Sequence, residues 1–151
     1  EAALKAKREG KIRYIGFTGH CWPSLMQTML NFDFPWDTVQ MPLNLFDYHY
    51  RSFTQNLLPE VIKKNLGVIG MKSLAGGNIL ETVLTPEQAI NYSLSLPIST
   101  LVSGMDSLEI LEENLNIVRN WRLMKQERQE DLLNKSMPYA EDGKYEHYKV
   151  K

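Results

Sequence analysis

The 151-residue chain has few cysteines, no long apolar run and no excess of charge of one sign, and each of these absences excludes or disfavours a class of protein. Its single cysteine, Cys21, excludes an internal disulfide and any zinc or iron–sulfur site built from cysteines. No apolar run approaches the roughly 20 residues that a membrane-spanning helix needs. The 17 Lys and Arg nearly balance the 18 Asp and Glu, so charge gives no reason to expect nucleic acid or a membrane as a partner. We therefore expect a cytoplasmic globular protein.

Two glycine-based motifs for phosphate binding are also missing. No G-x-G-x-x-G follows a strand candidate, and residues 74–77, the glycine-rich stretch after an apolar segment, lack that spacing. The G-x-x-x-x-G-K-S/T loop is absent as well. Both absences weigh against a dinucleotide-binding open sheet. Asp47 and His49 have no spacing typical of a metal site, and we predict no metal.

What the chain does contain is a fourfold alternation of apolar segments and helical periodicity. The apolar segments begin near residues 12, 37, 67 and 98, about 25 to 31 residues apart. This is the length of one βα unit, and it predicts an α/β fold with a parallel sheet and right-handed crossovers. The sheet is either a doubly wound open sheet or part of a (β/α)₈ barrel, of which four units make half.

The predicted helices carry start signals and apolar stripes. Thr85 followed by Pro86 is a good helix start, and a further helix is predicted over residues 53–65. Apolar residues recur at helical spacing in two stripes. The stripes are Leu25, Met29 and Phe32, and Leu108, Leu111, Leu115 and Val118.

The two ends of the sequence predict a fragment of a longer chain. Glu1 lies within a run of strong helix formers that has no N-cap residue, and the other end has no closing feature. Residues 1–120 hold the four βα units. Residues 121–151 form a charged helix and tail, which we expect to lie over the outside of the fold, with a partner-binding arm as the alternative.

Polar residues gather where the predicted strands end, which in a barrel is the functional face. Gln40 lies within an apolar strand, where its amide needs either a ligand or a neighbouring loop as partner. Lys72 closes the third strand, and three interpretations of it stay open. It is a point charge that binds phosphate, a Schiff-base or general-base lysine, or a side chain that simply reaches water. His20 suits an acid–base role or a plain loop position. His49 belongs to the aromatic loop 46–50, which either walls a substrate pocket or covers the barrel rim.

The turn at residues 103–107 joins the last strand candidate to a helix. Its backbone N–H groups converge at a helix N-terminus, which favours an anion such as phosphate. The alternative is a capping box formed by Asp106 and Glu109, with Asp in place of Ser or Thr. Asp106 competes with an anion for the same positive end, so both interpretations stay open.

Four segments together resemble a known family. Residues 12–20, 38–44, 67–77 and 102–114 are similar, in order and spacing, to the second half of the aldo/keto reductases, over residues 1–120. The tail at residues 138–146 resembles the C-terminal extension of a bacterial-type branch. The resemblance implies a (β/α)₈ TIM-type barrel, here its last four βα units and a helical tail. It also implies NAD(P)H-dependent reduction of aldehydes or ketones, or the reverse oxidation of alcohols.

The resemblance further implies a nicotinamide cofactor, NADP with NAD as the alternative, bound across the carboxyl end of the barrel. By position, Thr18, Gly19 and Gln40 match contacts to the nicotinamide carboxamide. Met71 takes the place of a tyrosine that stacks on the nicotinamide ring. The positions that match the pyrophosphate loop and the adenosine-binding residues are Lys72, Ser73, Leu74, Ala75, Gly76, Gly104, Met105, Asp106, Glu113 and Asn114.

Two departures from the family pattern concern the cofactor contacts. Thr18 and Gly19 stand where many members have Ser-Asn. Met105 and Asp106 stand where many members have Arg or Lys for the 2′-phosphate. Because an acidic side chain repels a 2′-phosphate and accepts a ribose hydroxyl, we expect a weak or relaxed preference for NADP.

The catalytic Asp, Tyr, Lys and His of the family all belong to the first half of the barrel, before residue 1. We therefore assign no catalytic residue and expect the chain alone to be inactive, with the N-terminal half of the barrel as its partner. One alternative is a stable, non-catalytic half-barrel that binds a ligand or self-associates. Another is a phosphate-binding isomerase or aldolase that uses Lys72. The identity of the carbonyl or alcohol substrate is not predicted.

Overall fold

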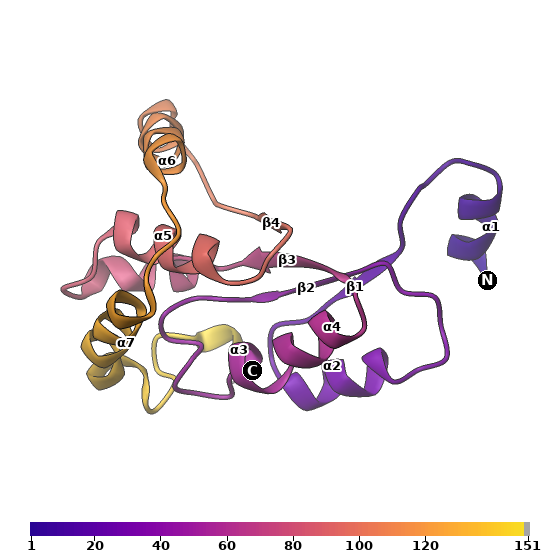
Figure 1. The fold of residues 1–151 in the computed structure, drawn as a ribbon, viewed down its shortest axis with the longest axis horizontal. Coiled ribbons are helices and arrows are strands. Elements are labelled where there is room, and N and C mark those ends of the chain that lie inside the picture. The colour runs from indigo at the N-terminus through magenta and orange to yellow at the C-terminus, as the bar shows by residue number, and fades with distance from the viewer. Residues whose placement is uncertain (150–151) are drawn as a thin grey trace.

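A parallel sheet of four strands organises the protein (Figure 1). The computed structural model describes residues 1–149. In their order across the sheet, the strands are β1 (Gly16–Thr18), β2 (Thr38–Pro42), β3 (Gly67–Met71) and β4 (Thr100–Leu101). Thr18 pairs with Gln40, which pairs in turn with Ile69. Because all pairings are parallel, the carboxyl ends of the strands meet at one edge.

Helices occupy every connection between neighbouring strands, as the length of the repeats predicts. Helix α2 (Pro23–Leu30) joins β1 to β2, α3 (Phe53–Asn56) and α4 (Leu58–Lys63) join β2 to β3, and the 3₁₀ turn η1 (Ala75–Glu81) and α5 (Pro86–Ser95) join β3 to β4. Outside these connections, α1 (Ala2–Arg8) precedes β1, and α6 (Leu108–Asn120), α7 (Gln126–Ala140) and the 3₁₀ turn η2 (His147–Lys149) follow β4. The α/β class and the βα repeat are therefore confirmed.

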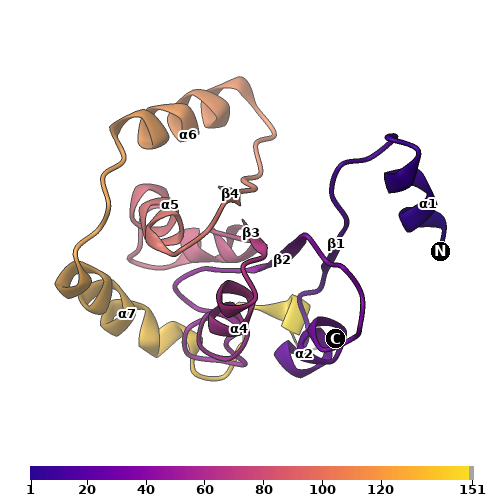
Figure 2. The ribbon, with the colours of Figure 1, turned by 45° about the vertical axis from the view of Figure 1, so that its right-hand side comes forward.

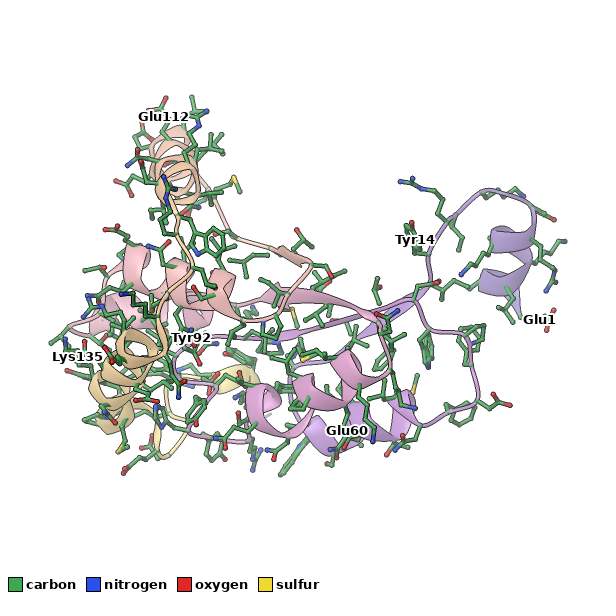
Figure 3. The ribbon with its side chains drawn as sticks, in the orientation of Figure 1. Glu1, Tyr14, Glu60, Tyr92, Glu112 and Lys135 are labelled. Atoms are coloured by element: carbon green, nitrogen blue, oxygen red, sulfur yellow. The ribbon has the colours of Figure 1, made fainter. Side chains whose placement is uncertain are left out.

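Two hydrophobic clusters form the core. The first joins α2, α3 and α4 to β2 and β3, through residues such as Leu30, Val39, Phe53 and Val61. The second lies among η1, α5 and α7 and includes Tyr92. Figure 3 shows Tyr92 inside the molecule, whereas Glu112 projects from α6 and Lys135 from α7. The βα units thus build an apolar interior of their own.

The predicted start of α5 is confirmed in atomic detail. The Thr85 hydroxyl accepts a hydrogen bond from the Gln88 N–H at 3.2 Å, and the Gln88 side chain accepts one from the Thr85 N–H at 3.1 Å. This is a complete capping box, which satisfies two N–H groups that a helix leaves free. Pro86 follows in the first turn, where its missing N–H costs nothing.

The prediction of one continuous helix over residues 53–65 is wrong. The structure divides it into α3 and α4, with Leu57 between them. Pro59 lies in the first turn of α4. Since proline has no N–H to donate to the carbonyl four residues earlier, the first helix cannot continue through it.

The first strand is shorter than its apolar run. Only Gly16–Thr18 pair with β2, whereas Ile12 and Tyr14 are 38% and 66% exposed. Figure 3 shows Tyr14 on the connection between α1 and the sheet. The Ile15 N–H donates to the Asp37 carboxylate at 2.7 Å, and the Ile15 carbonyl accepts a hydrogen bond from the Asp37 N–H at 2.7 Å, so Asp37 holds this segment through both its side chain and its backbone.

The two predicted apolar stripes do not face the core. Helix α2 buries Met26 and Leu30, while Leu25 and Phe32 are exposed. On α6, Leu108, Leu115 and Val118 are exposed, and this helix stands away from the sheet in both views (Figures 1 and 2). Periodicity identifies an apolar face, but which face is covered depends on the neighbouring elements that are present.

Candidate functional site

A pocket of ≈ 590 Å³ lies where β2, β3 and β4 end. This size lies within the range of ordinary small-molecule sites. Nine of the predicted site residues line the pocket: Gln40, Met71, Lys72, Ser73, Leu74, Gly76, Gly104, Met105 and Asp106. The fold thus brings together residues that are up to 66 positions apart in the sequence (Gln40 to Asp106).

Gln40 carries a side-chain amide that has no strong partner. Its Nε2 donates to the Sδ of Met71 at 3.1 Å, and a thioether is a weak acceptor. The side chain is half-buried at the pocket wall, between Thr18 on β1 and Ile69 on β3 in the sheet register. Of the two interpretations given to this residue, a ligand-facing amide agrees better with this geometry than a glutamine bonded to a neighbouring loop.

The turn after β3 has an unusual backbone. Lys72 and Ala75 have positive φ angles of 60° and 50°, and Gly76 and Gly77 follow with 75° and 101°. Positive φ is rare for residues with a Cβ. The Asn44 side chain fixes the turn by donating to the Lys72 carbonyl at 3.0 Å. At Gly76 and Gly77 the left-handed backbone, rather than lack of space, requires glycine.

Two residues of this turn differ in their surroundings. Lys72 lines the pocket with an exposed side chain, so it lacks the desolvation that activates a Schiff-base lysine. This disfavours the isomerase or aldolase alternative. Ala75 is fully buried in the second core cluster and does not line the pocket.

The cap of α6 corrects one of our interpretations. Ser107, not Asp106, is the N-cap, and its hydroxyl accepts a hydrogen bond from the Ile110 N–H at 3.2 Å. The capping box of Asp106 with Glu109 is therefore wrong. Hydrogen bonds from its own N–H and from Ser107 lower the pKa of the Glu109 carboxyl. Asp106 stays exposed at the pocket, free of a capping role.

Four other predicted site residues lie outside the pocket lining. Thr18 ends β1 and Gly19 follows it, and the Gly19 N–H donates to the Gln40 carbonyl at 3.4 Å. Glu113 is exposed on α6. Asn114 is buried, and its amide donates to the Ser103 hydroxyl and to the Gly104 carbonyl, both at 3.3 Å. Asn114 therefore holds the loop that forms one wall of the pocket.

The aromatic loop 46–50 faces the C-terminal helix. Phe46 packs against Tyr145, with ring centroids 5.7 Å apart. The His49 Nε2 lies 3.0 Å from both the Leu133 carbonyl and the Ser136 hydroxyl, and burial lowers the pKa of this imidazole. No residue of the loop belongs to the pocket lining described above. The loop contacts α7 and Tyr145, and the choice between the two interpretations stays a prediction.

A buried cluster of charges was missed by sequence reasoning. The Nζ of Lys149, which is fully buried, lies 2.6 Å from Asp47 Oδ1, 3.0 Å from Glu146 Oε2 and 2.7 Å from the Tyr50 carbonyl. Asp47 also accepts hydrogen bonds from the N–H groups of Phe53 and Thr54. Part of the tail is thus inside the molecule rather than over its surface. Nothing in the sequence of the lysine-rich tail indicated that part of it is buried.

Glu146 should make the stability of the protein depend on pH. Burial, opposed by Lys149, raises the pKa of this carboxyl above its ordinary 4.5. An acid with a raised pKa is more easily protonated in the folded than in the unfolded state. We therefore expect the free energy of unfolding to fall as pH rises above about 4.5, and Glu146→Gln to reduce this fall.

Urea denaturation between about pH 4.5 and 8 measures this dependence. The exposed Glu112 provides a matched control, since Glu112→Gln should leave the slope of stability against pH unchanged. Equal slopes in the wild type and in Glu146→Gln would contradict the assignment.

Comparison with known proteins settles the family. The model described as "Aldo/keto reductase family" matches residues 2–132. The chain belongs to the aldo/keto reductase family. This confirms the resemblance found in the sequence, and with it an oxidoreductase family. No curated protein sequence matches the chain.

Solved aldo-keto reductases share the fold. The holo form of an aldo-keto reductase from Bacillus halodurans has a TM-score of 0.70 at 17% identity, over 87% of this chain and 52% of that one. A glycerol dehydrogenase from Gluconobacter oxydans has a TM-score of 0.68 at 18% identity, over 92% and 53%. This chain spans about half the length of the reductase structures it matches. The expected fold, four βα units of a (β/α)₈ barrel, is confirmed.

Within residues 1–149, no helix combines the length and the apolar character needed to cross a bilayer. In the same part of the chain, no group of three or more His, Cys, Asp or Glu side chains is placed to hold a metal ion.

Proposed function

We propose that this aldo/keto reductase chain is the cofactor-binding half of a cytoplasmic enzyme that reduces aldehydes or ketones with NAD(P)H, or oxidises alcohols in reverse. The observation that carries the proposal is the pocket at the strand ends. It joins an amide without a strong partner, Gln40, to a left-handed glycine turn and to the loop before α6. These are the elements that a nicotinamide, a pyrophosphate and an adenosine require.

The residues of the pocket fit such a cofactor. Gln40 has an amide free to pair with a carboxamide, and Met71 beside it offers a polarisable thioether for a ring to pack on. At Gly76 the backbone can be approached closely, because a Cβ added there would meet no atom within 4 Å. The loop 104–106 would meet the adenosine end. When bound, the cofactor supplies or accepts the hydride.

Carbonyl reduction also needs a proton donor beside the substrate. Among the residues that line the pocket, Lys72 and Asp106 are the charged ones, and both side chains are exposed. Burial raises the pKa of Tyr148, whose ring faces the Lys72 ammonium, and its hydroxyl donates to Glu146 at 2.6 Å. That hydroxyl is therefore a poor acid. We infer that the N-terminal half of the barrel supplies the catalytic acid and that this chain alone is inactive.

Fluorescence titration of the 151-residue chain with NADPH and NADH tests the proposal, with its mass in solution measured alongside. Saturable binding supports a cofactor-binding half that folds by itself. If the chain remains folded and binds neither nucleotide, the same titration of the complete polypeptide decides whether the pocket is a cofactor site. Failure there as well would refute the proposed cofactor site.

Asp106 should control the choice between the two nucleotides. The exposed carboxylate repels a 2′-phosphate, so the wild type should favour NADPH over NADH by less than about a hundredfold. Asp106→Arg should strengthen NADPH binding by about tenfold and leave NADH binding nearly unchanged, because arginine pairs with phosphate. Asp33→Arg, an exposed position away from the pocket, is the matched control. Equal gains for both nucleotides would contradict this role.

A second candidate function is a non-catalytic half-barrel that self-associates. The exposed apolar face of α6, with Leu108 72% and Val118 51% exposed, favours it. Strands β1 and β4 are also unpaired at the outer edges of the described sheet, and such edges promote pairing between chains. The mass measurement distinguishes the two: the missing half of the barrel should convert a self-associated species into a one-to-one complex.

A further inference from the structure

The last described residues of the chain, 145–149, form what we call the C-terminal strap. It crosses from α7 to the ends of the strands, and its 3₁₀ turn η2 lies beside α3 (Figure 1). Lys149 anchors it through Asp47, Glu146 and the Tyr50 carbonyl, as described above. A buried ammonium keeps its charge only when its partners are held in place, so the anchor fixes the strap.

The anchor places Tyr148 across the ends of three strands. Its ring lies edge-on to His20, which follows β1, with centroids 6.0 Å apart. Its hydroxyl accepts a hydrogen bond from Asn44, which follows β2, at 3.1 Å. The Nζ of Lys72, which follows β3, lies 5.5 Å from the centre of the ring, within the range of a cation–π contact.

Lys72 is therefore held twice by the same network. The Asn44 amide donates both to the Lys72 carbonyl and to the Tyr148 hydroxyl, at 3.0 and 3.1 Å. The carbonyl bond stabilises a backbone whose φ of 60° is rare outside glycine. The ammonium lies over the ring of Tyr148. Lys72 is also the cation in the lining of the pocket, where Asp106 is the other charge.

We propose that Tyr148 is a positioning residue, by which the C-terminal strap holds the Lys72 ammonium in place to bind the phosphate groups of the cofactor. This inference rests on the proposed function, because it takes the pocket to be a nucleotide site. Lys72 makes the contact with phosphate. Tyr148 acts through Lys72. Because the ring orders the four-carbon side chain of Lys72 before the cofactor binds, less conformational entropy is lost on binding.

A double-mutant cycle in the full polypeptide that carries this chain tests the proposal, with NADPH affinity as the readout. Tyr148→Leu removes the ring, and we expect affinity to fall by about two- to fivefold, as one partly exposed cation–π contact predicts. In a Lys72→Met background, Tyr148→Leu should have no further effect. Tyr148→Phe, which keeps the ring, should bind within about twofold of the wild type. Tyr14→Leu, at an exposed tyrosine, is the matched control.

The ring can also be altered without changing its shape. Pentafluorophenylalanine at position 148 removes the negative face of the ring. The protein with this residue should therefore bind NADPH more weakly than Tyr148→Phe does, and this difference should be seen only while Lys72 is present. This comparison tests the proposal in place of Tyr148→Leu if that variant does not fold. Inorganic pyrophosphate, used as a competitor, should lose affinity in parallel with NADPH, whereas adenosine should not.

The outcomes separate this inference from the proposed function. If the wild type binds NADPH but Tyr148→Leu weakens binding equally with and without Lys72, the positioning role is wrong and the pocket assignment stands. Unchanged affinity in Tyr148→Leu refutes it too. If the folded wild type binds no nucleotide, the proposed function fails, and the positioning role fails with it.

Discussion

Replacing Lys149 with methionine is expected to lower the free energy of unfolding by about 3–5 kcal/mol. The ammonium is fully buried and pairs with Asp47 at 2.6 Å and with Glu146 at 3.0 Å. Lys149→Met keeps much of the apolar stem but leaves two buried carboxylates without their cation. The loss should exceed the value of the ion pair itself, because desolvated charges are costly once unpaired.

Urea denaturation at neutral pH measures the effect. Lys63 on α4 is exposed, and Lys63→Met should change stability by no more than about 0.5 kcal/mol. A change in Lys149→Met as small as in this control would show that the buried cluster does not stabilise the folded state. Adding Asp47→Asn to Lys149→Met should restore part of the loss, since one of the unpaired charges is then gone.

The largest effect on binding is expected at Gln40. Gln40→Leu should weaken nicotinamide cofactor binding by about 10- to 100-fold, because a carboxamide in the pocket would lose both a donor and an acceptor. The folded state should lose little, since the amide bonds only to the weakly accepting Sδ of Met71. Affinity and stability should therefore separate in this variant.

Fluorescence titration with NADPH and NADH measures the loss, and both nucleotides should be affected alike because they share the carboxamide. Gln126→Leu, at an exposed position on α7, is the matched control and should bind as the wild type does. Tight binding by Gln40→Leu would remove Gln40 from the site and leave the pocket to another ligand.

The fold followed from the sequence because its signals are local. Repeats of one βα length predict a parallel sheet, and Thr85 with Pro86 and Gln88 begins α5 through contacts within one helical turn. Prediction failed where the partner is distant. The stripe at Leu108, Leu115 and Val118 is apolar by periodicity, but only its neighbours decide whether it is covered, and in this chain it is exposed.

The candidate site divides in the same way. The pattern of segments identified Gln40 and the glycine turn, and the pocket unites them with the loop before α6. A capping residue was misassigned by one position, Asp106 for Ser107, because Asp and Ser have similar preferences for a helix start. The hydrogen bonds of Asn114 to Ser103 and Gly104 required the three-dimensional path of the loop.

The sequence by itself determined the family, the α/β class, the parallel repeat and most of the pocket, since these depend on local patterns and on segments in a fixed order. Tertiary structure alone decided the burial of Lys149 and the contact of Tyr148 with Lys72. Residues 47 and 149 are 102 positions apart. No periodicity or spacing relates such residues, and a lysine near the end of a charged tail is normally solvated. Only packing could place its ammonium between two carboxylates.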